Sequence, residues 1–528
     1  MTFIYPLAKR CDESHFYTEG GSQLRTLHGD HLLQRLQRET EGALHARLFR
    51  SLRGAIIDGI MLPQSRLPAS RDLARELGVS RNTVLNAYEH LLAEGYVKAR
   101  TGSGTWVAET LPDSCLSSSG AASRTTQPRV PAVKMSRRGA SLLGYAGASP
   151  HQWGAFVPGA PDVTAFPHAQ FSRIQARLSR EPAIERLIYS SAGGCSELRG
   201  ALADYLRVAR SVNCDADQIL ITEGVHQAVD LVSRMLCDSG DRVWIEDPGY
   251  WGTRNILRIN GLKIMPVPVD EEGIIPASDA DRAPPRLMFV TPSHQYPLGS
   301  HLSLARRQQM LALARRHHSW IVEDDYDSEF RFSGQPFPSL QGLEADAPVI
   351  YMGTFSKTLY PALRIGYMIV PKQLIAPLRT AAAELYRGGH LLIQRALAEF
   401  IREGHYAAHI RRMRLLYGKR RAFLISLIQR YLGPDFLREF NHEAGLHLVL
   451  NLPDGCDDVA IAARALRQGV KVRPLSQYYM QPQARRGLLL GFACVEERVM
   501  LPAFNVLRDC LAKNGVASRA DHHQAAGP

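Results

Sequence analysis

The sequence predicts an α/β protein with a small helical domain ahead of it, and three observations support this prediction. From Trp153 to about Leu511, short apolar strands alternate with amphipathic helices, the pattern of an α/β domain. Residues 41–110 instead read as three helices and a β-hairpin. Between Val349 and Val370, a lysine and an arginine stand between two apolar strands in VIYMGTFSKTLYPALRIGYMIV. A chain of 528 residues is long enough for two or more domains.

The amino-acid composition limits which binding partners and which cellular compartment are expected for this protein. The formal net charge of +12 fits a polyanion partner, although many basic proteins bind none. The eight cysteines include no C-x-x-C pair, which argues against a zinc site and favours reduced thiols in a cytosol. No apolar run reaches the ~18 residues of a membrane span. We therefore expect no metal and no membrane partner. We also expect no signal peptide, because the apolar patch at the N-terminus precedes Lys9 and Arg10, the reverse of a signal peptide's order.

The first forty residues are expected to be an N-terminal extension, in which residues 31–38 could form a short helix. A helical period then runs from Leu44 to Ile60. Ser70 is placed to cap a second short helix, which Gly78 ends. Ser80 is placed to cap a third helix. The buried stripe expected on that third helix consists of Val84, Tyr88, Leu91 and Leu92.

Residues 96–107 complete the domain as a hairpin turned by TGSG, so the order is that of a winged helix-turn-helix. Donors at the start of a recognition helix, and a glycine-rich wing, are placed to contact DNA. The candidate DNA contacts are Arg71, Arg81, Asn82, Thr83, Arg100, Gly102 and Ser103. These polar residues could instead merely solvate helix starts. LPASRDLARELGVSRNTVLNAYEHLLAEGYVKARTGSGTWV resembles the GntR-family domain, which implies double-stranded DNA as a partner.

The rest of the chain divides by composition. Residues 111–150 are rich in Ser, Ala, Thr and Pro and favour a linker, while residues 515–528 favour a loose tail. Residues 151–514 form the α/β domain, with a smaller α+β lobe from about residue 380. Its predicted strands are Ile219–Thr222, Val243–Glu246, Leu287–Thr291, Ile321–Asp324 and Val349–Gly353, and its predicted helices include His226–Leu236, Leu304–His317 and Ala503–Leu511.

Two of these strand ends carry candidate chemistry. A lysine at the mouth of a buried strand, here Lys357, tends to lose its proton, as Schiff-base chemistry requires. The alternative is a lysine on a surface loop. Another strand ends in the carboxylate cluster of WIVEDDYDSEF. Because ligands bind beyond the carboxyl ends of parallel strands, both ends could reach one crevice.

TFSKTLYPALRIGY and VEDDYDSEF resemble the pyridoxal phosphate (PLP) site of fold-type I aminotransferases, in the version of the MocR-type regulators of the GntR superfamily. The resemblance implies that Lys357 forms an aldimine with PLP and that Asp324 bonds the pyridine nitrogen. Strand alternation alone shows only that Asp324 and Asp325 face opposite sides. The remaining cofactor contacts implied are Tyr326 to the phenolic oxygen, Tyr250 on the ring face, and Gly224, Val225, His226 and Arg364 to the phosphate.

The sequence departs from the aminotransferase pattern at the substrate side. Tyr296 stands where aminotransferases carry asparagine in an N-P-x-G turn. Leu489 stands where many carry the arginine that grips a carboxylate, and Arg473 is a candidate replacement that could contact an effector. Gly252 stands where some MocR-type regulators have an arginine.

The resemblance therefore implies a PLP-dependent transcription regulator in the bacterial cytosol, associated with the nucleoid. Its aminotransferase-like domain would sense PLP or a small amino compound through aldimine chemistry, and it would form a homodimer. We do not expect an enzyme as its physiological role, although residual half-transamination is allowed. One alternative is an active aminotransferase with a DNA-binding head, and another is a large domain that only dimerises.

Overall fold

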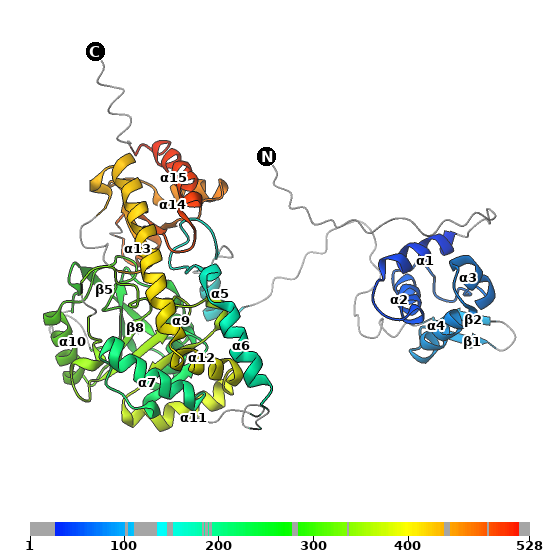
Figure 1. The fold of residues 1–528 in the computed structure, drawn as a ribbon, viewed down its shortest axis with the longest axis horizontal. Helices are drawn as coiled ribbons and strands as arrows, with labels where there is room; N and C mark the ends of the chain where they lie inside the picture. The colour runs from blue at the N-terminus through cyan, green and yellow to red at the C-terminus, as the bar shows by residue number, and fades with distance from the viewer. Residues whose placement is uncertain are drawn as a thin grey trace, which may run out of the picture. The chain divides into compact units, whose positions relative to one another are not determined.

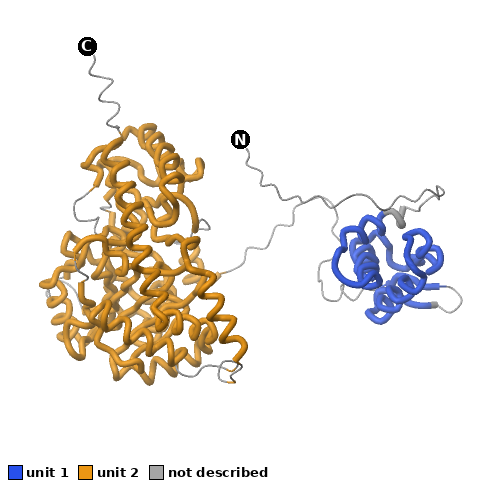
Figure 2. Tube along the Cα trace, in the orientation of Figure 1, with its two compact units in different colours: residues 1–132 blue, residues 133–528 orange. Residues whose placement is uncertain are grey.

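The structure is a computed structural model, and it falls into two compact units, residues 1–132 and 133–528 (Figures 1 and 2). It describes residues 27–100, 104–109, 135–144, 152–181, 184, 188, 193–276, 284–334, 337–437, 444–482 and 485–516. Each unit has its own hydrophobic core.

The first unit has the predicted order of helices followed by a hairpin. Its elements are α1 (Leu27–Arg38), α2 (Leu44–Ile57), α3 (Ser70–Leu77), α4 (Arg81–Ala93), β1 (Val97–Arg100) and β2 (Gly104–Val107). The two strands pair antiparallel, with Val97 opposite Val107. This arrangement is the winged helix-turn-helix expected from the sequence.

Helix α1 belongs to the core of the first unit. Leu32 and Leu36 are buried among the side chains of α2, α3 and α4. Arg35 forms an ion pair with Asp58, beyond the end of α2. The short helix expected in the N-terminal extension is therefore packed onto the winged helix-turn-helix.

Two details of the predicted helices are corrected. Ala69 occupies the N-cap of α3 and Ser70 is its first residue, so Ser70 does not cap it. Leu92 is 45% exposed, because it lies in the last turn of α4, outside the stripe that faces the core. The cap at Ser80 is present: its hydroxyl accepts from the Thr83 N–H at 3.1 Å.

The second unit contains the remaining elements. Its long helices are α5 (Arg137–Gly144), α6 (His168–Ser179), α7 (Ser196–Arg210), α8 (Val225–Leu236), α9 (Trp251–Ile259), α10 (Leu304–Arg316), α11 (Ile375–Tyr386), α12 (Leu391–Arg402), α13 (His405–Tyr431), α14 (Asp458–Arg467) and α15 (Glu497–Ala512). Its strands are β3 (Ile219–Thr222), β4 (Arg242–Asp247), β5 (Lys263–Asp270), β6 (Gly273–Ile274), β7 (Leu287–Val290), β8 (Trp320–Asp325), β9 (Val349–Thr354), β10 (Gly366–Ile369), β11 (His447–Asn451), β12 (Arg473–Pro474) and β13 (Gly487–Gly491).

The large sheet has the strand order β3-β10-β9-β8-β7-β4-β5-β6. Strands β9, β8, β7, β4 and β5 pair in parallel, and β10 pairs antiparallel with both β9 and β3. Strand β3 therefore runs in the same direction as the parallel set. The carboxyl ends of β3, β9, β8, β7 and β4 consequently lie along one edge of the sheet.

Alternation along the strands separates two faces of this sheet. One face packs on α8, α9 and α11, with Val322 of β8 among its buried residues. The other face packs on α10 through residues such as Ile321 of β8. Asp324 shares the side of Val322, and Asp325 shares the side of Ile321. The two aspartates thus enter different environments.

A smaller sheet, of order β11-β13-β12, forms the lobe with α14 and α15. This lobe begins later than expected. Helices α11 and α12 pack against α8, α6 and α7 around the large sheet, and long α13 runs from α12 to α15 (Figure 1). The boundary therefore lies within α13 rather than near residue 380, because the apolar faces of α11 and α12 are covered by the large domain.

Part of the expected linker is helical. Helix α5 lies against α9, and Arg138 Nη1 donates to the Ile259 carbonyl at 3.2 Å. The rest of the expected linker, and the tail beyond Val516, lie outside the described residues. Over the described part of the chain, no helix combines the length and apolar character needed to cross a membrane.

Candidate functional site

The loops that follow five strands of the large sheet meet at its carboxyl edge. Gly224 follows β3, Tyr250 follows β4, Tyr296 follows β7, Tyr326 follows β8 and Lys357 follows β9. Because these strands run in the same direction, residues far apart in sequence are brought to one crevice.

Lys357 lies half-buried at this edge. Burial lowers the pKa of its ammonium, and the carboxylates of Asp327 and Asp324 oppose that effect. Gly159 packs directly against it, since a Cβ at residue 159 would lie 3.3 Å from Lys357 Nζ. Gly159 also has φ +67°, which favours glycine, so the backbone approaches the lysine closely.

The two aspartates of β8 have separate partners. Asp325 is buried and accepts from Arg210 Nε at 2.7 Å and from the Tyr351 hydroxyl at 2.5 Å. Asp324 Oδ1 is buried without a hydrogen-bond partner. The pKa of Asp324 is raised to about 7, mainly by burial and further by the neighbouring carboxylates. A buried oxygen of this kind calls for a hydrogen-bond donor.

The turn between β3 and α8 forms a cradle for an anion. Gly224 is the N-cap of α8 with φ +96° and ψ 175°, and no side chain caps the helix. No N-cap side chain therefore accepts a hydrogen bond from the first N–H groups of α8, which include those of Val225 and His226. The Arg364 guanidinium lies beside the turn, 3.6 Å from where a Cβ of residue 224 would stand. Helix dipole and guanidinium both favour negative charge here.

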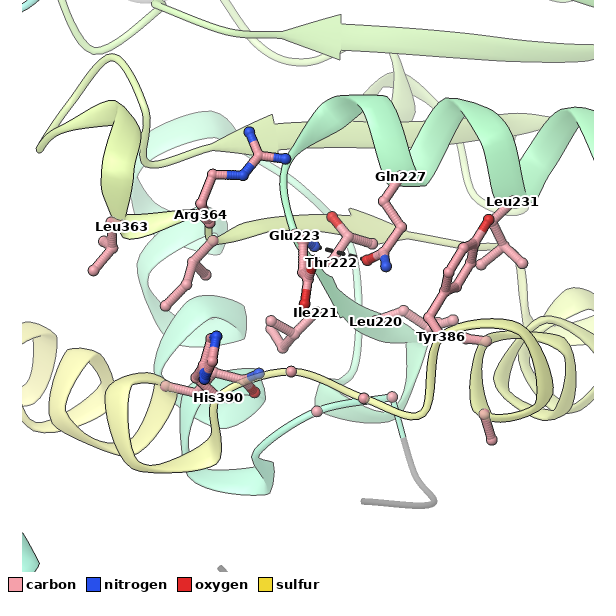
Figure 3. Close-up of a pocket in the computed structure, with 18 residues that line it drawn as sticks. Leu220, Ile221, Thr222, Glu223, Gln227, Leu231, Leu363, Arg364, Tyr386 and His390 are labelled. Carbon is pink, nitrogen blue, oxygen red and sulfur yellow. Dashed lines mark hydrogen bonds between the residues drawn. The ribbon is translucent and has the colours of Figure 1, made fainter. Parts of the chain in front are cut away.

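A pocket opens on this side of the sheet, along edge strand β3. Thr222, Glu223 and Arg364 border it together with Tyr386 and His390 (Figure 3). The Glu223 N–H donates to Gln227 Oε1 at 2.7 Å, which fixes the start of α8.

Tyr250 is held by contacts with the same turn. Its hydroxyl lies 3.0 Å from His226 Nε2, and its ring makes an edge contact with Tyr296 at 5.7 Å. A Cβ at Gly252 would lie 2.5 Å from both His226 Nε2 and Tyr250 Cε1. A side chain at residue 252 would therefore require the rings of His226 and Tyr250 to move.

Tyr326 has partners that the sequence did not single out. Its hydroxyl lies 2.8 Å from His294 Nδ1, and the same nitrogen is 3.2 Å from both oxygens of Asp327. A cluster of a histidine and an aspartate therefore adjoins the predicted tyrosine. Sequence signals were available in the run SHQYP and in the last acid of DDYD, Asp327, but their contact arises only from the fold.

Arg473 and Leu489 lie directly opposite each other on β12 and β13. The positive charge of Arg473 lowers the pKa of Tyr250, Tyr296 and Tyr478 against the larger effect of burial. Arg473 therefore lies near the same aromatic cluster as the predicted cofactor residues.

These residues fit pyridoxal phosphate. The unpartnered Asp324 oxygen suits a pyridinium N–H, the turn at Gly224 suits a phosphate, and Lys357 with a lowered pKa suits an aldehyde. No cluster of three or more His, Cys, Asp or Glu side chains suited to a metal occurs among the described residues.

The candidate DNA contacts lie at the starts of α3 and α4. Arg71, Arg81 and Asn82 are exposed and Thr83 is half-buried. Arg81 Nε donates to Ser70 Oγ at 3.4 Å, so the two helix starts are adjacent. Arg100 ends β1, but its side chain, together with Gly102 and Ser103, lies outside the described residues.

Arg66 is an exposed arginine beside the wing that the sequence analysis did not single out. It forms a bridge with Trp106, and its guanidinium covers Gly104 at the base of the wing. A bend with two prolines hides such a contact from periodicity analysis, because residues 61–68 have no regular pattern.

The fold defines an aminotransferase-like domain and a winged helix-turn-helix domain within one chain. Residues 168–490 match the family model for aminotransferase class I and II, and residues 44–107 match that for bacterial regulatory proteins of the gntR family. The structure is similar to LysN, an α-aminoadipate aminotransferase from Thermus thermophilus, with TM-score 0.63 and 27% identity over 72% of this chain and 99% of that chain.

Regulators match over both domains. The chain is 40% identical to the probable rhizopine catabolism regulatory protein MocR of Rhizobium meliloti, over 90% of this chain and 94% of that protein. It is 32% identical to the pyridoxine biosynthesis regulator PdxR of Corynebacterium glutamicum, over 86% of this chain and 93% of that protein. The chain belongs to the MocR-type transcription regulators of the GntR family.

Proposed function

We propose that this protein regulates transcription in response to PLP or to a small amino compound that reacts with PLP. The convergence of Lys357, Asp324 and the Gly224 turn at one edge of the large sheet carries the proposal. The relative named for pyridoxine biosynthesis supports the cofactor itself as one effector.

The proposed roles follow from the contacts of each residue. PLP supplies an aldehyde that condenses with primary amines and a ring that withdraws electrons. Lys357 holds the aldehyde, Asp324 accepts from the ring nitrogen, and Tyr250 covers the ring face. Tyr326 is proposed to reach the phenolic oxygen, with His294 orienting its hydroxyl.

The phosphate is assigned to the turn after β3. The N–H groups of Gly224, Val225 and His226 lie at the N-terminus of α8, where the helix dipole favours an anion, and Arg364 supplies the countercharge. Burial and the charges of Arg364 and Lys357 lower the pKa of His226, which favours a neutral imidazole beside Tyr250.

DNA binding is assigned to residues 41–110, with α1 bracing the domain. The proposed contacts are Arg71, Arg81, Asn82, Thr83, Arg100, Gly102 and Ser103. Residues 151–514 form the cofactor domain, residues 111–150 the linker and residues 515–528 the tail. We propose that the protein is a homodimer in the bacterial cytosol, at the nucleoid.

The test of the cofactor site is covalent labelling of Lys357. Protein loaded with PLP is expected to absorb visible light, and borohydride reduction is expected to attach the cofactor to the Lys357 peptide. Lys357→Ala removes both signals, whereas Lys372→Ala, at an exposed lysine 3.9 Å from Asp215, retains them. A label on another lysine overturns the assignment.

An active aminotransferase is the second candidate, because Lys357, Asp324 and Tyr326 form a complete set for transamination. Leu489 removes a grip on the substrate carboxylate, and loss of positioning lowers rates steeply. We expect PLP-dependent DNA binding and little turnover on common amino acids. Equal DNA binding by PLP-loaded, PLP-free and Lys357→Ala protein, together with rapid keto-acid release, would favour the enzyme.

A further inference from the structure

One face of the small sheet carries His447. In the pairing of β11 with β13, His447 lies opposite Gly491 and Val449 lies opposite Leu489. Residues two apart on a strand share a face, and directly paired residues share it too. His447, Val449, Leu489 and Arg473 therefore project on the same side of the sheet.

This face borders the proposed cofactor site. Val449 and Leu489 pack with Leu298, and the ring of Tyr296 lies against the same cluster. The His447 ring lies 5.4 Å from the ring of Tyr296 and 5.5 Å from that of His294. The charge of Lys357 contributes to the lowered pKa of His447, which places the imidazole near the lysine.

The hydrogen bond of His447 defines its tautomer. Its Nε2 lies 2.9 Å from the Pro297 carbonyl oxygen, and a carbonyl can only accept. Nε2 therefore carries the hydrogen. Burial lowers the pKa of His447 to about 3, so the imidazole is neutral and Nδ1 presents a lone pair.

That lone pair is buried without a partner. His447 is 2% exposed, and its Nδ1 has no hydrogen-bond donor. The nearest aromatic neighbours are engaged elsewhere: the Tyr296 hydroxyl pairs with the Tyr478 hydroxyl at 3.1 Å, and His294 Nδ1 with the Tyr326 hydroxyl at 2.8 Å. A buried acceptor without a donor is unfavourable, so a donor from outside the protein would be bound selectively.

We propose that His447 Nδ1 is the acceptor of an effector subsite, which selects primary amines that carry a second hydrogen-bond donor. This inference rests on the proposed function and names the class of its effector. The second donor is a hydroxyl or an amino group. A carboxylate oxygen at this point would face another lone pair and be rejected.

The experiment compares amines of equal size. PLP-loaded protein is titrated with ethanolamine against propylamine, and with 3-aminopropan-1-ol and 1,3-diaminopropane against butylamine. Binding is followed by calorimetry and by the change in cofactor absorbance. Wild-type protein is expected to prefer each donor-bearing amine by about tenfold, the factor that one satisfied hydrogen bond commonly gives.

Two substitutions of His447 test the acceptor at Nδ1 separately from the hydrogen bond between Nε2 and the Pro297 carbonyl. His447→Gln puts an amide donor near Nε2 and removes the acceptor at Nδ1, so the tenfold preference is lost while alkyl amines bind as before. His447→Asn puts an amide oxygen near Nδ1 and is expected to retain part of the preference. Retention of the full preference in His447→Gln overturns the proposal.

The outcomes distinguish this inference from the proposed function. Without a PLP label on Lys357, the proposed function itself fails. If PLP binds and amines titrate but each equal-size pair binds alike in wild-type protein, a water satisfies Nδ1 and only the effector subsite is refuted.

Discussion

The two units place their proposed functional side chains in contrasting environments. In the first unit, Arg71 and Arg81 stand exposed at helix starts. In the second unit, Asp324 Oδ1 is buried without a partner, and burial lowers the pKa of Lys357. The first unit can bind through charges that water and salt screen, whereas the second can bind through groups whose protonation the protein itself controls. Salt should therefore act on one unit and pH on the other.

The largest expected effect is that of salt on DNA binding. Neutralising phosphates releases counterions, so operator affinity should fall on the order of a thousandfold between roughly 50 and 200 mM salt. Arg71→Ala and Arg81→Ala should each weaken binding and reduce the slope of log affinity against log salt by about one. Fluorescence anisotropy with labelled operator DNA measures both.

Arg173→Ala is the control, because it removes one exposed charge from α6 in the second unit. Its salt slope should match that of wild-type protein. If Arg71→Ala and Arg81→Ala also match it while folded, the assignment of the DNA surface is wrong.

The next largest effect concerns the stability of the second unit. Asp325→Asn leaves Arg210 buried without its charged partner, in a pair whose side chains are 1% and 4% exposed. Breaking one partner of a buried pair costs about 3–5 kcal/mol. Urea unfolding should show this loss in the second unit alone, with the first unit unchanged.

The sequence predicted the elements better than the contacts between them. Strands β3, β4, β7, β8 and β9 and the capped α4 follow from apolar periodicity and from local signals such as Ser80. Lys357 was singled out by its place after a strand, whereas the choice of Asp324 over Asp325 came from the family resemblance, and both assignments stay predictions. These features are local in the chain, and local signals are what a sequence displays.

Contacts between distant segments were not predictable in this way. His294 meets Asp327 and Tyr326, and His447 meets Pro297, only because five strand ends and the small sheet come together. Leu32 and Leu36 of α1 likewise gain their role from packing on the first unit. Burial and unmet hydrogen bonds become visible only after folding.

A smaller effect concerns Asp324, the other aspartate at the end of β8, and it depends on pH. Without PLP, the pKa of Asp324 is raised from 3.8 to about 7. Between those values the folded protein holds a proton that the unfolded chain has released, so stability falls as pH rises. Asp324→Asn lacks this charge. Its melting temperature should match that of wild-type protein only near about pH 4, and it should exceed the wild-type value increasingly up to about pH 8, as measured by calorimetry.

PLP should reverse that order. Its ring nitrogen would donate a hydrogen bond to the Asp324 carboxylate, and the amide of asparagine is a poorer acceptor for that bond. Loaded Asp324→Asn should melt below loaded wild-type protein at the higher pH. Equal melting of the PLP-free proteins across the whole range would mean that Asp324 keeps an ordinary pKa.

The smallest expected effect is confined to the first unit. The Ser80 hydroxyl accepts from the Thr83 N–H at 3.1 Å and lies 2.8 Å from the Thr83 hydroxyl. Ser80→Ala removes this cap and should cost about 1 kcal/mol, whereas Ser80→Asp restores an acceptor and should lose little. For the stability measurement, Ser70→Ala is a matched comparison, since Ser70 caps no helix. Because the cap orders the start of α4, where Arg81 and Asn82 lie, Ser80→Ala should also weaken operator binding. Retention of PLP should be unchanged, and a loss of PLP in Ser80→Ala would show that the two units are not energetically separate.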